Sequence, residues 1–274
     1  MKKIVTVMLS LVLCCGLFAG CGDEREDEGI KSATYDPSKE QIVVATNAAF
    51  APFEYTVGDR FAGIDMEIAK GFADSLGQEL VILDMEFDSV VTSVGKNGVD
   101  IAMAGLTVTE KRKESVNFTD TYYNASQMVI VKADDTTFDD CTTADEIVAK
   151  LNVSGVKIGV QAGTTGESFV RGSADLGFDG LLNVQCVAHS NAGLAVTDMK
   201  NGNVNYVVVD EAPAKNLVGK IDGIKVIDIK LTDEEYAFGV DKAQPDLLES
   251  LNAYLKGIKE DGTFDGILSK YFQG

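Results

Sequence analysis

The sequence predicts an α/β protein of two lobes, each built around its own mainly parallel sheet. From Gln41 onward, short apolar runs with strand character alternate with amphipathic helical stretches, and such alternation is typical of parallel sheets. The 274-residue chain also holds more candidate strands than one sheet of its length usually contains. We therefore expect two sheets, and hence two lobes.

The N-terminus has the pattern of a secretory signal peptide over residues 1–20. Two lysines precede the apolar run Ile4–Phe18, which is too short for a good membrane-spanning helix. Phe18-Ala19-Gly20-Cys21 also resembles a bacterial lipoprotein box, in which the cysteine takes lipid and becomes the first residue of the mature chain. The alternative is a plain cleaved signal followed by an incidental cysteine.

Residues 21–40 are rich in Asp, Glu, Lys and Ser and are expected to form a lipidated, flexible tether. The net charge of −19 argues against a nucleic-acid partner. Of the five cysteines, Cys141 and Cys186 remain beyond the signal peptide and Cys21. They lack C-x-x-C spacing, so no metal site is indicated. They could form a disulfide or remain two separate buried thiols.

Secondary structure follows from hydrophobic periodicity. Strands are expected at Ile42–Thr46, Leu80–Phe87, Val99–Ala104, Gln127–Val131, Lys157–Gln161, Val184–Val187 and Val204–Val209. Helices are expected at Asp65–Leu76, Asp88–Val94, Ala144–Leu151, Pro245–Lys259 and Phe264–Tyr271. Thr143 and Glu146 have capping-box spacing, and the strand at Gln127–Val131 is a candidate to cross between lobes.

Two strand-to-helix junctions in the first half of the chain carry candidate binding residues, and ligands of open α/β sheets gather at such junctions. In residues 47–55, Phe50 is the candidate for an exposed stacking surface, whereas Phe53 is expected in the core. In residues 104–112, a helix begins with Arg112 in its first turn. Free N–H groups and a planar guanidinium both suit a carboxylate. The alternative is a surface arginine paired with Glu110 or Glu114.

Two further junctions lie in the second half. In Gln161–Glu167 a strand passes into a helix through glycine and threonine, where Thr164 and Thr165 can donate hydrogen bonds; the alternative is an ordinary helix-capping turn. Asp210 follows directly on a buried strand, so it either caps the next helix or binds a ligand ammonium. Together the junctions supply a cation, an acid and aromatic faces, which match a free amino acid.

The order and spacing of these segments resemble the polar amino-acid solute-binding family, the extracytoplasmic subunits of ABC importers. The resemblance covers residues 41–274. The matching pieces are Ala51-Pro52-Phe53-Glu54, Gly63-Ile64-Asp65, Val99-Asp100, Thr107 to Arg112, Phe118-Thr119-Asp120-Thr121-Tyr122-Tyr123, Gly163-Thr164-Thr165-Gly166-Glu167 and Asp261-Gly262-Thr263 before Tyr271-Phe272.

The resemblance implies a two-lobe, periplasmic-binding-protein-like fold of type II, with two hinge strands and the ligand in the interlobe cleft. Lobe 1 would comprise residues 41–127 and 237–274, and lobe 2 residues 128–236.

The resemblance also implies roles for the site residues. Arg112 would grip the α-carboxylate, assisted by N–H groups of Thr107 and Thr165. Asp210 would take the α-ammonium, assisted by the carbonyl of Gly105. The remaining expected ligand contacts are side-chain contacts: Phe50 and Phe87 would face the ligand side chain, and Asn47 and Gln161 would tune its recognition. Asn47 departs from many relatives that bind Lys, Arg or Gln and carry Asp there.

The resemblance therefore implies a monomeric lipoprotein outside the cytoplasm that passes a free L-amino acid to an ABC permease, with no cofactor and no metal. An exported enzyme on the same fold, such as a cyclohexadienyl dehydratase, is the main alternative, and a sensing module is another. The chain has one histidine, His189, and no Ser-His-Asp order, so we expect a binding protein rather than an enzyme.

Overall fold

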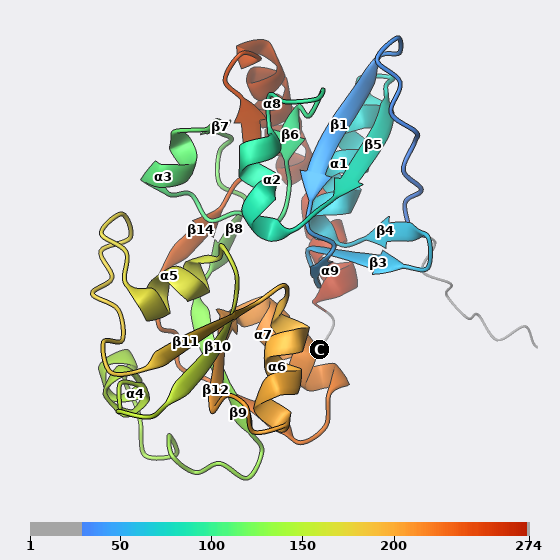
Figure 1. Ribbon diagram of the computed structural model, residues 1–274. Helices are drawn as coiled ribbons and strands as arrows, with labels where there is room; N and C mark the ends of the chain where they lie inside the picture. The colour runs from blue at the N-terminus through green and yellow to red at the C-terminus, as the bar shows by residue number, and fades with distance from the viewer. Residues whose placement is uncertain (1–28, 273–274) are drawn as a thin grey trace, which may run out of the picture.

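The computed structural model describes residues 29–272, and in it two lobes lie one above the other, joined by strands that cross between them (Figure 1). Each lobe contains a five-stranded sheet, and helices pack around both sheets. The predicted two-lobe α/β fold is confirmed. The signal peptide expected at 1–20 and Cys21 lie outside the described residues.

The sheet of lobe 1 has the strand order β5-β1-β6-β15-β7. Its strands are β1 (Gln41–Thr46), β5 (Glu79–Asp84), β6 (Ile101–Ala102), β7 (Val116–Phe118) and β15 (Gly239–Asp241). β1 pairs in parallel with β5 and β6, whereas β15 is antiparallel to β6 and β7. Successive residues of β1 pack into different core clusters, Val44 into one and Val43 into the other, so both faces of this sheet are covered.

The helices of lobe 1 are α1 (Ile64–Ser75), α2 (Phe87–Ser93), α3 (Glu110–Lys113), α8 (Pro245–Glu260) and α9 (Thr263–Tyr271). A small antiparallel sheet of β2 (Ala49–Phe50), β3 (Glu54–Val57) and β4 (Arg60–Ala62) lies beside them. The expected strand at Leu80–Phe87 ends early, because Phe87 already begins α2.

The sheet of lobe 2 has the order β11-β10-β12-β9-β13. Its strands are β9 (Gln127–Lys132), β10 (Lys157–Gln161), β11 (Gln185–His189), β12 (Tyr206–Asp210) and β13 (Ile224–Ile227). Its helices are α4 (Ala144–Leu151), α5 (Thr165–Arg171), α6 (Ala192–Lys200) and α7 (Glu211–Lys220). The predicted capping box of Thr143 and Glu146 at α4 is confirmed.

Two short antiparallel strands, β8 (Tyr123–Ala125) and β14 (Glu234–Tyr236), form their own sheet between the lobes. β8 leads into β9 of lobe 2, and β14 leads into β15 of lobe 1. The expectation that Gln127–Val131 crosses between lobes was therefore wrong: this run is β9, buried within the sheet of lobe 2, and the crossing is made by the short strand before it.

The flexible tether expected over 21–40 was too long. The main chains of Ile30 and Phe61 exchange two hydrogen bonds of 2.6 and 2.9 Å, and the N–H of Ala33 donates to Leu80. The hydroxyl of Ser32 accepts from the N–H of Ile82 at 2.8 Å. From residue 29 the chain thus lies against the edge of lobe 1, because a few apolar and hydroxyl residues among the charges find partners there.

Within residues 29–272, no helix is both long and apolar enough to span a membrane. The same residues contain no group of three or more His, Cys, Asp or Glu side chains arranged to hold a metal ion. Cys141 and Cys186 are free thiols, both half-buried, in lobe 2.

Candidate ligand-binding site

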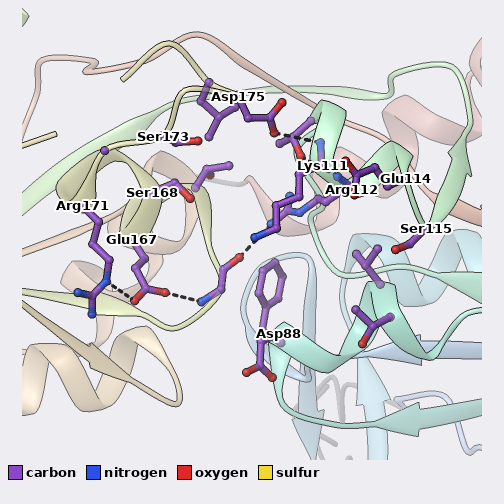
Figure 2. A pocket seen from close by; sticks show the side chains of 18 residues that line it. Asp88, Lys111, Arg112, Glu114, Ser115, Glu167, Ser168, Arg171, Ser173 and Asp175 are labelled. Carbon is purple, nitrogen blue, oxygen red and sulfur yellow. Dashed lines mark hydrogen bonds and ion pairs between the residues drawn. The ribbon is translucent and has the colours of Figure 1, made fainter. Parts of the chain in front are cut away.

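Arg112 places its guanidinium between the lobes. It lies on α3, where the N-capping hydroxyl of Thr109 accepts from the N–H of Arg112 at 3.1 Å. Nη1 donates to the carbonyl of Thr107 at 2.7 Å, and Nη2 reaches the carbonyl of Gly163 in lobe 2 at 3.3 Å (Figure 2). The guanidinium also lies 5.4 Å from the ring centre of Phe87, a cation–π distance.

The alternative reading of Arg112 as a surface ion pair is not supported, because Glu110 pairs with Lys113 at 2.7 Å. Burial lowers the pKa of Arg112, and the negative charges of Glu234 and Asp210 oppose that shift. Three carboxylates from beyond α3, those of Glu234, Asp210 and Asp175, therefore lie within electrostatic reach of the guanidinium.

Asp210 ends β12 and is buried, with 4% of its surface exposed. It occupies the N-cap position of α7 but makes no side-chain capping hydrogen bond. Instead its Oδ1 accepts from the hydroxyl of Tyr236 at 2.5 Å. Burial, followed by the charge of Glu234, raises the pKa of Asp210 to about 7. A ligand ammonium would stabilise its ionised form.

Glu234 is a buried acid that the sequence did not single out. Its carboxylate accepts from the hydroxyls of Thr107 at 2.6 Å and Thr165 at 2.7 Å. It also accepts from the hydroxyl of Thr232 at 2.8 Å and from the side-chain amide of Gln127 at 3.2 Å. Thr107 and Thr165, expected to bind a ligand carboxylate through their N–H groups, therefore use their hydroxyls on the protein's own carboxylate.

The aromatic and small residues of the site lie deeper than expected. Phe50 is buried rather than exposed, with its ring 6.2 Å from that of Phe53. It covers Gly105, where an added Cβ would lie 3.0 Å from the Phe50 ring. Gly105 has a φ of +53°, a conformation that favours glycine. The Phe50 ring thus leaves little room for a side chain at position 105.

The remaining expected residues are also placed near the interlobe contact. Gln161 donates to Asn47 across the lobes at 2.9 Å. The hydroxyl of Thr164 donates to the carbonyl of Gln161 at 2.8 Å and accepts from the N–H of Glu167 at 3.2 Å. Thr164 therefore caps α5, as the capping alternative proposed, and its hydroxyl does not point to a ligand.

A cavity of about 560 Å³ opens between the lobes beside these residues (Figure 2). Phe87, Arg112 and Thr165 line it, together with Asp88 and Asp175. Asp210 is not among its lining residues. The cavity therefore reaches the carboxylate-binding half of the expected site, while the ammonium-binding half is enclosed.

The lobes are in contact around this cavity. Asp175 of lobe 2 accepts from the N–H groups of Glu110 and Lys111 in lobe 1, each at 3.1 Å. A second contact joins α7 of lobe 2 to β3 of lobe 1, where the ammonium of Lys220 lies 5.6 Å from the ring centre of Tyr55. With the contacts of Arg112 and Gln161, these describe a closed arrangement.

Comparisons with known proteins show the family and the fold. Residues 42–274 match the family model of bacterial extracellular solute-binding proteins, family 3. The arginine-binding extracellular protein ArtP of Bacillus subtilis is 27% identical, over 97% of this chain and 98% of its own length.

Solved structures are similar over most of the chain. The amino acid ABC transporter substrate-binding protein AbpA of Streptococcus pneumoniae, bound to L-arginine, is 30% identical with a TM-score of 0.74, over 85% of this chain and 95% of that one. An ancestral amino acid-binding protein, a precursor of cyclohexadienyl dehydratase, is 28% identical with a TM-score of 0.75, over 85% and 96%.

Proposed function

Because the chain belongs to family 3 of the bacterial extracellular solute-binding proteins, we propose that it captures a polar L-amino acid between its lobes and delivers it to an ABC permease. The proposal includes a lipid anchor at Cys21 and a monomeric protein outside the cytoplasm. The relatives are extracellular or transporter-associated amino-acid binders, which supports this assignment.

One observation carries the proposal: the guanidinium of Arg112 in lobe 1 reaches the carbonyl of Gly163 in lobe 2 at 3.3 Å, and the charge of Asp210 in lobe 2 acts on it. A zwitterion bound between them would place its carboxylate at Arg112 and its ammonium at Asp210. Each charge-assisted hydrogen bond contributes on the order of 1.5–3 kcal/mol net. Since the two groups come from different lobes, such a ligand binds the closed arrangement best and shifts the population toward it.

The side chain of Gln161 favours a ligand that can donate hydrogen bonds. The side-chain oxygen of Gln161 is buried and has no hydrogen-bond partner within residues 29–272. A buried acceptor without a donor is unfavourable, so a side-chain N–H group of the ligand would stabilise it. Arginine, lysine, ornithine, histidine and glutamine all supply such a group.

The test is a thermal-shift screen against the twenty amino acids, cystine and ornithine, followed by calorimetry on the hits. We expect stabilisation by one or a few polar amino acids. A screen without a hit at millimolar concentration would contradict the proposal.

The similarity to a precursor of cyclohexadienyl dehydratase gives one reason to test for enzyme activity. His189 does not favour such activity, because it is not among the residues that line the cavity. Its Nε2 pairs with Asp198 at 2.8 Å, between β11 and α6 of lobe 2. Incubating the purified protein with prephenate tests this directly; turnover would favour the enzyme.

A further inference from the structure

The carboxylate of Glu234 joins the two lobes at the strands that cross between them. A single oxygen, Oε2, accepts from the hydroxyls of both Thr107 and Thr165. Thr107 lies in the loop after β6 of lobe 1, and Thr165 begins α5 of lobe 2. Both hydrogen bonds can exist together only while α5 lies against that loop, which is the closed arrangement.

The second oxygen, Oε1, holds Glu234 in place. It accepts from the hydroxyl of Thr232 and the side-chain amide of Gln127. The same amide nitrogen lies 3.1 Å from the hydroxyl of Thr165. Glu234 is only 7% exposed, and burying a carboxylate is costly unless donors fill its acceptor sites. Separation of the lobes would remove at least one of these donors.

We propose that Glu234 is a positioning residue for lobe closure. Its carboxylate, together with the hydroxyls of Thr107 and Thr165, forms the Glu234 bridge, which stabilises the closed arrangement and aligns the two threonines. Both oxygens of Glu234 already accept from the protein's own donors, so Glu234 does this without accepting a hydrogen bond from the ligand. The effect on amino-acid affinity rests on the proposed function; the effect on closure does not.

The variants are Glu234→Gln and Thr165→Val, with Glu235→Gln as matched control. The amide of Glu234→Gln keeps the shape and removes the charge. Glu235 neighbours Glu234 on β14 but is exposed, so its side chain lies outside the bridge. In a background in which the native cysteines, including Cys21, Cys141 and Cys186, are replaced, one spin label at Lys96 and one at Leu182 report the distance between the lobes. Circular dichroism and the melting temperature verify that each variant is folded.

Distances are measured without ligand and with saturating L-arginine. In whichever condition the parent protein is closed, we expect Glu234→Gln and Thr165→Val each to lower the closed-to-open ratio about tenfold. The double variant should lose little more than either single one, since both remove the same interaction. Glu235→Gln should resemble the parent. L-arginine, if bound, should dissociate about tenfold faster from Glu234→Gln.

A distance distribution in folded Glu234→Gln equal to that of the parent would overturn the proposal. A loss of closure in Glu235→Gln equal to that in Glu234→Gln would also overturn it. So would a parent protein that is open both without ligand and with saturating L-arginine. The ligand-free distances are independent of which amino acid binds, so a failed ligand screen leaves the closure result interpretable.

Discussion

The side-chain amide of Gln161 donates a 2.9 Å hydrogen bond to the side-chain oxygen of Asn47. The two residues come from different lobes, at the ends of β10 and β1. Asn47 donates in turn to the carbonyl of Met85 at 2.7 Å. A ligand side chain that binds here must therefore either displace this amide–amide hydrogen bond or form additional hydrogen bonds to the same two amides.

The substitution Asn47→Asp is expected to raise the affinity for lysine and arginine relative to glutamine. An aspartate still accepts the hydrogen bond from Gln161 and adds a negative charge opposite a cationic side chain. We expect a gain of about 1–2 kcal/mol in relative binding free energy. Calorimetry over the three amino acids measures the ranking. An unchanged order of affinities would count against this role of Asn47.

The substitution Arg112→Ala is expected to abolish amino-acid binding while the fold is retained. Removing the guanidinium leaves the ligand carboxylate unpaired in a closed cleft, at a cost of roughly 2–5 kcal/mol. The matched control is Arg60→Ala, since Arg60 is exposed on β4 and donates to the carbonyl of Gly29. Near-normal affinity in Arg112→Ala, with an unchanged melting temperature, would contradict the assigned site.

Binding should weaken as the pH falls below about 7. The raised pKa of Asp210, about 7, means that below this pH its carboxyl must release a proton before it can pair with an ammonium. The expected loss approaches tenfold in affinity per pH unit, and the ligand itself stays zwitterionic between pH 5 and 7. Asp210→Asn should bind weakly and with little pH dependence. A flat profile for the parent would exclude this pairing.

The ligand-free protein should lose stability as the pH rises toward 8. Burial raises the pKa of Asp65 to about 7 and that of Glu54 well above its usual range, with the charge of Asp65 as the second cause. Both carboxyls bind protons more tightly in the folded state. Their stabilisation is full below the unfolded pKa values near 4 and is lost as the pH passes the folded values.

Melting temperatures from pH 5 to 8 test this. Glu54→Gln, which removes one of the two titrating groups, should show a shallower decline than the parent. Glu249→Gln on the exposed face of α8 is the control and should follow the parent. The reverse slope, with stability rising through pH 7, would show that these acids are not protonated in the folded protein.

Most of the lobes could be predicted from the sequence because their strands are buried on both faces. The runs at β1, β10 and β12 are apolar without interruption, and α4 carries its capping box in its own residues. The crossing strands could not be predicted in the same way. β8 and β14 have three residues each, too few for a period to show, and each is stabilised by a partner distant in the sequence.

Arg112 and Asp210, the charged pair of the expected site, could be predicted because each follows a predicted strand. Glu234 could not be predicted, because it belongs to the acidic run Asp233-Glu234-Glu235, a pattern typical of solvent-exposed surface. Only the tertiary structure buries the middle residue and leaves Glu235 exposed. The enclosed position of Phe50 was missed for a related reason: its ring packs over Gly105, a residue distant in the sequence that only folding brings there.

The attachment of residues 29–33 to lobe 1 decides which half of the protein would stay with the bilayer. The few residues between Cys21 and Gly29 reach at most about 30 Å when fully extended. A lipid at Cys21 would keep lobe 1 within this distance of the membrane. Opening and closing of the cleft would then move lobe 2 relative to the membrane.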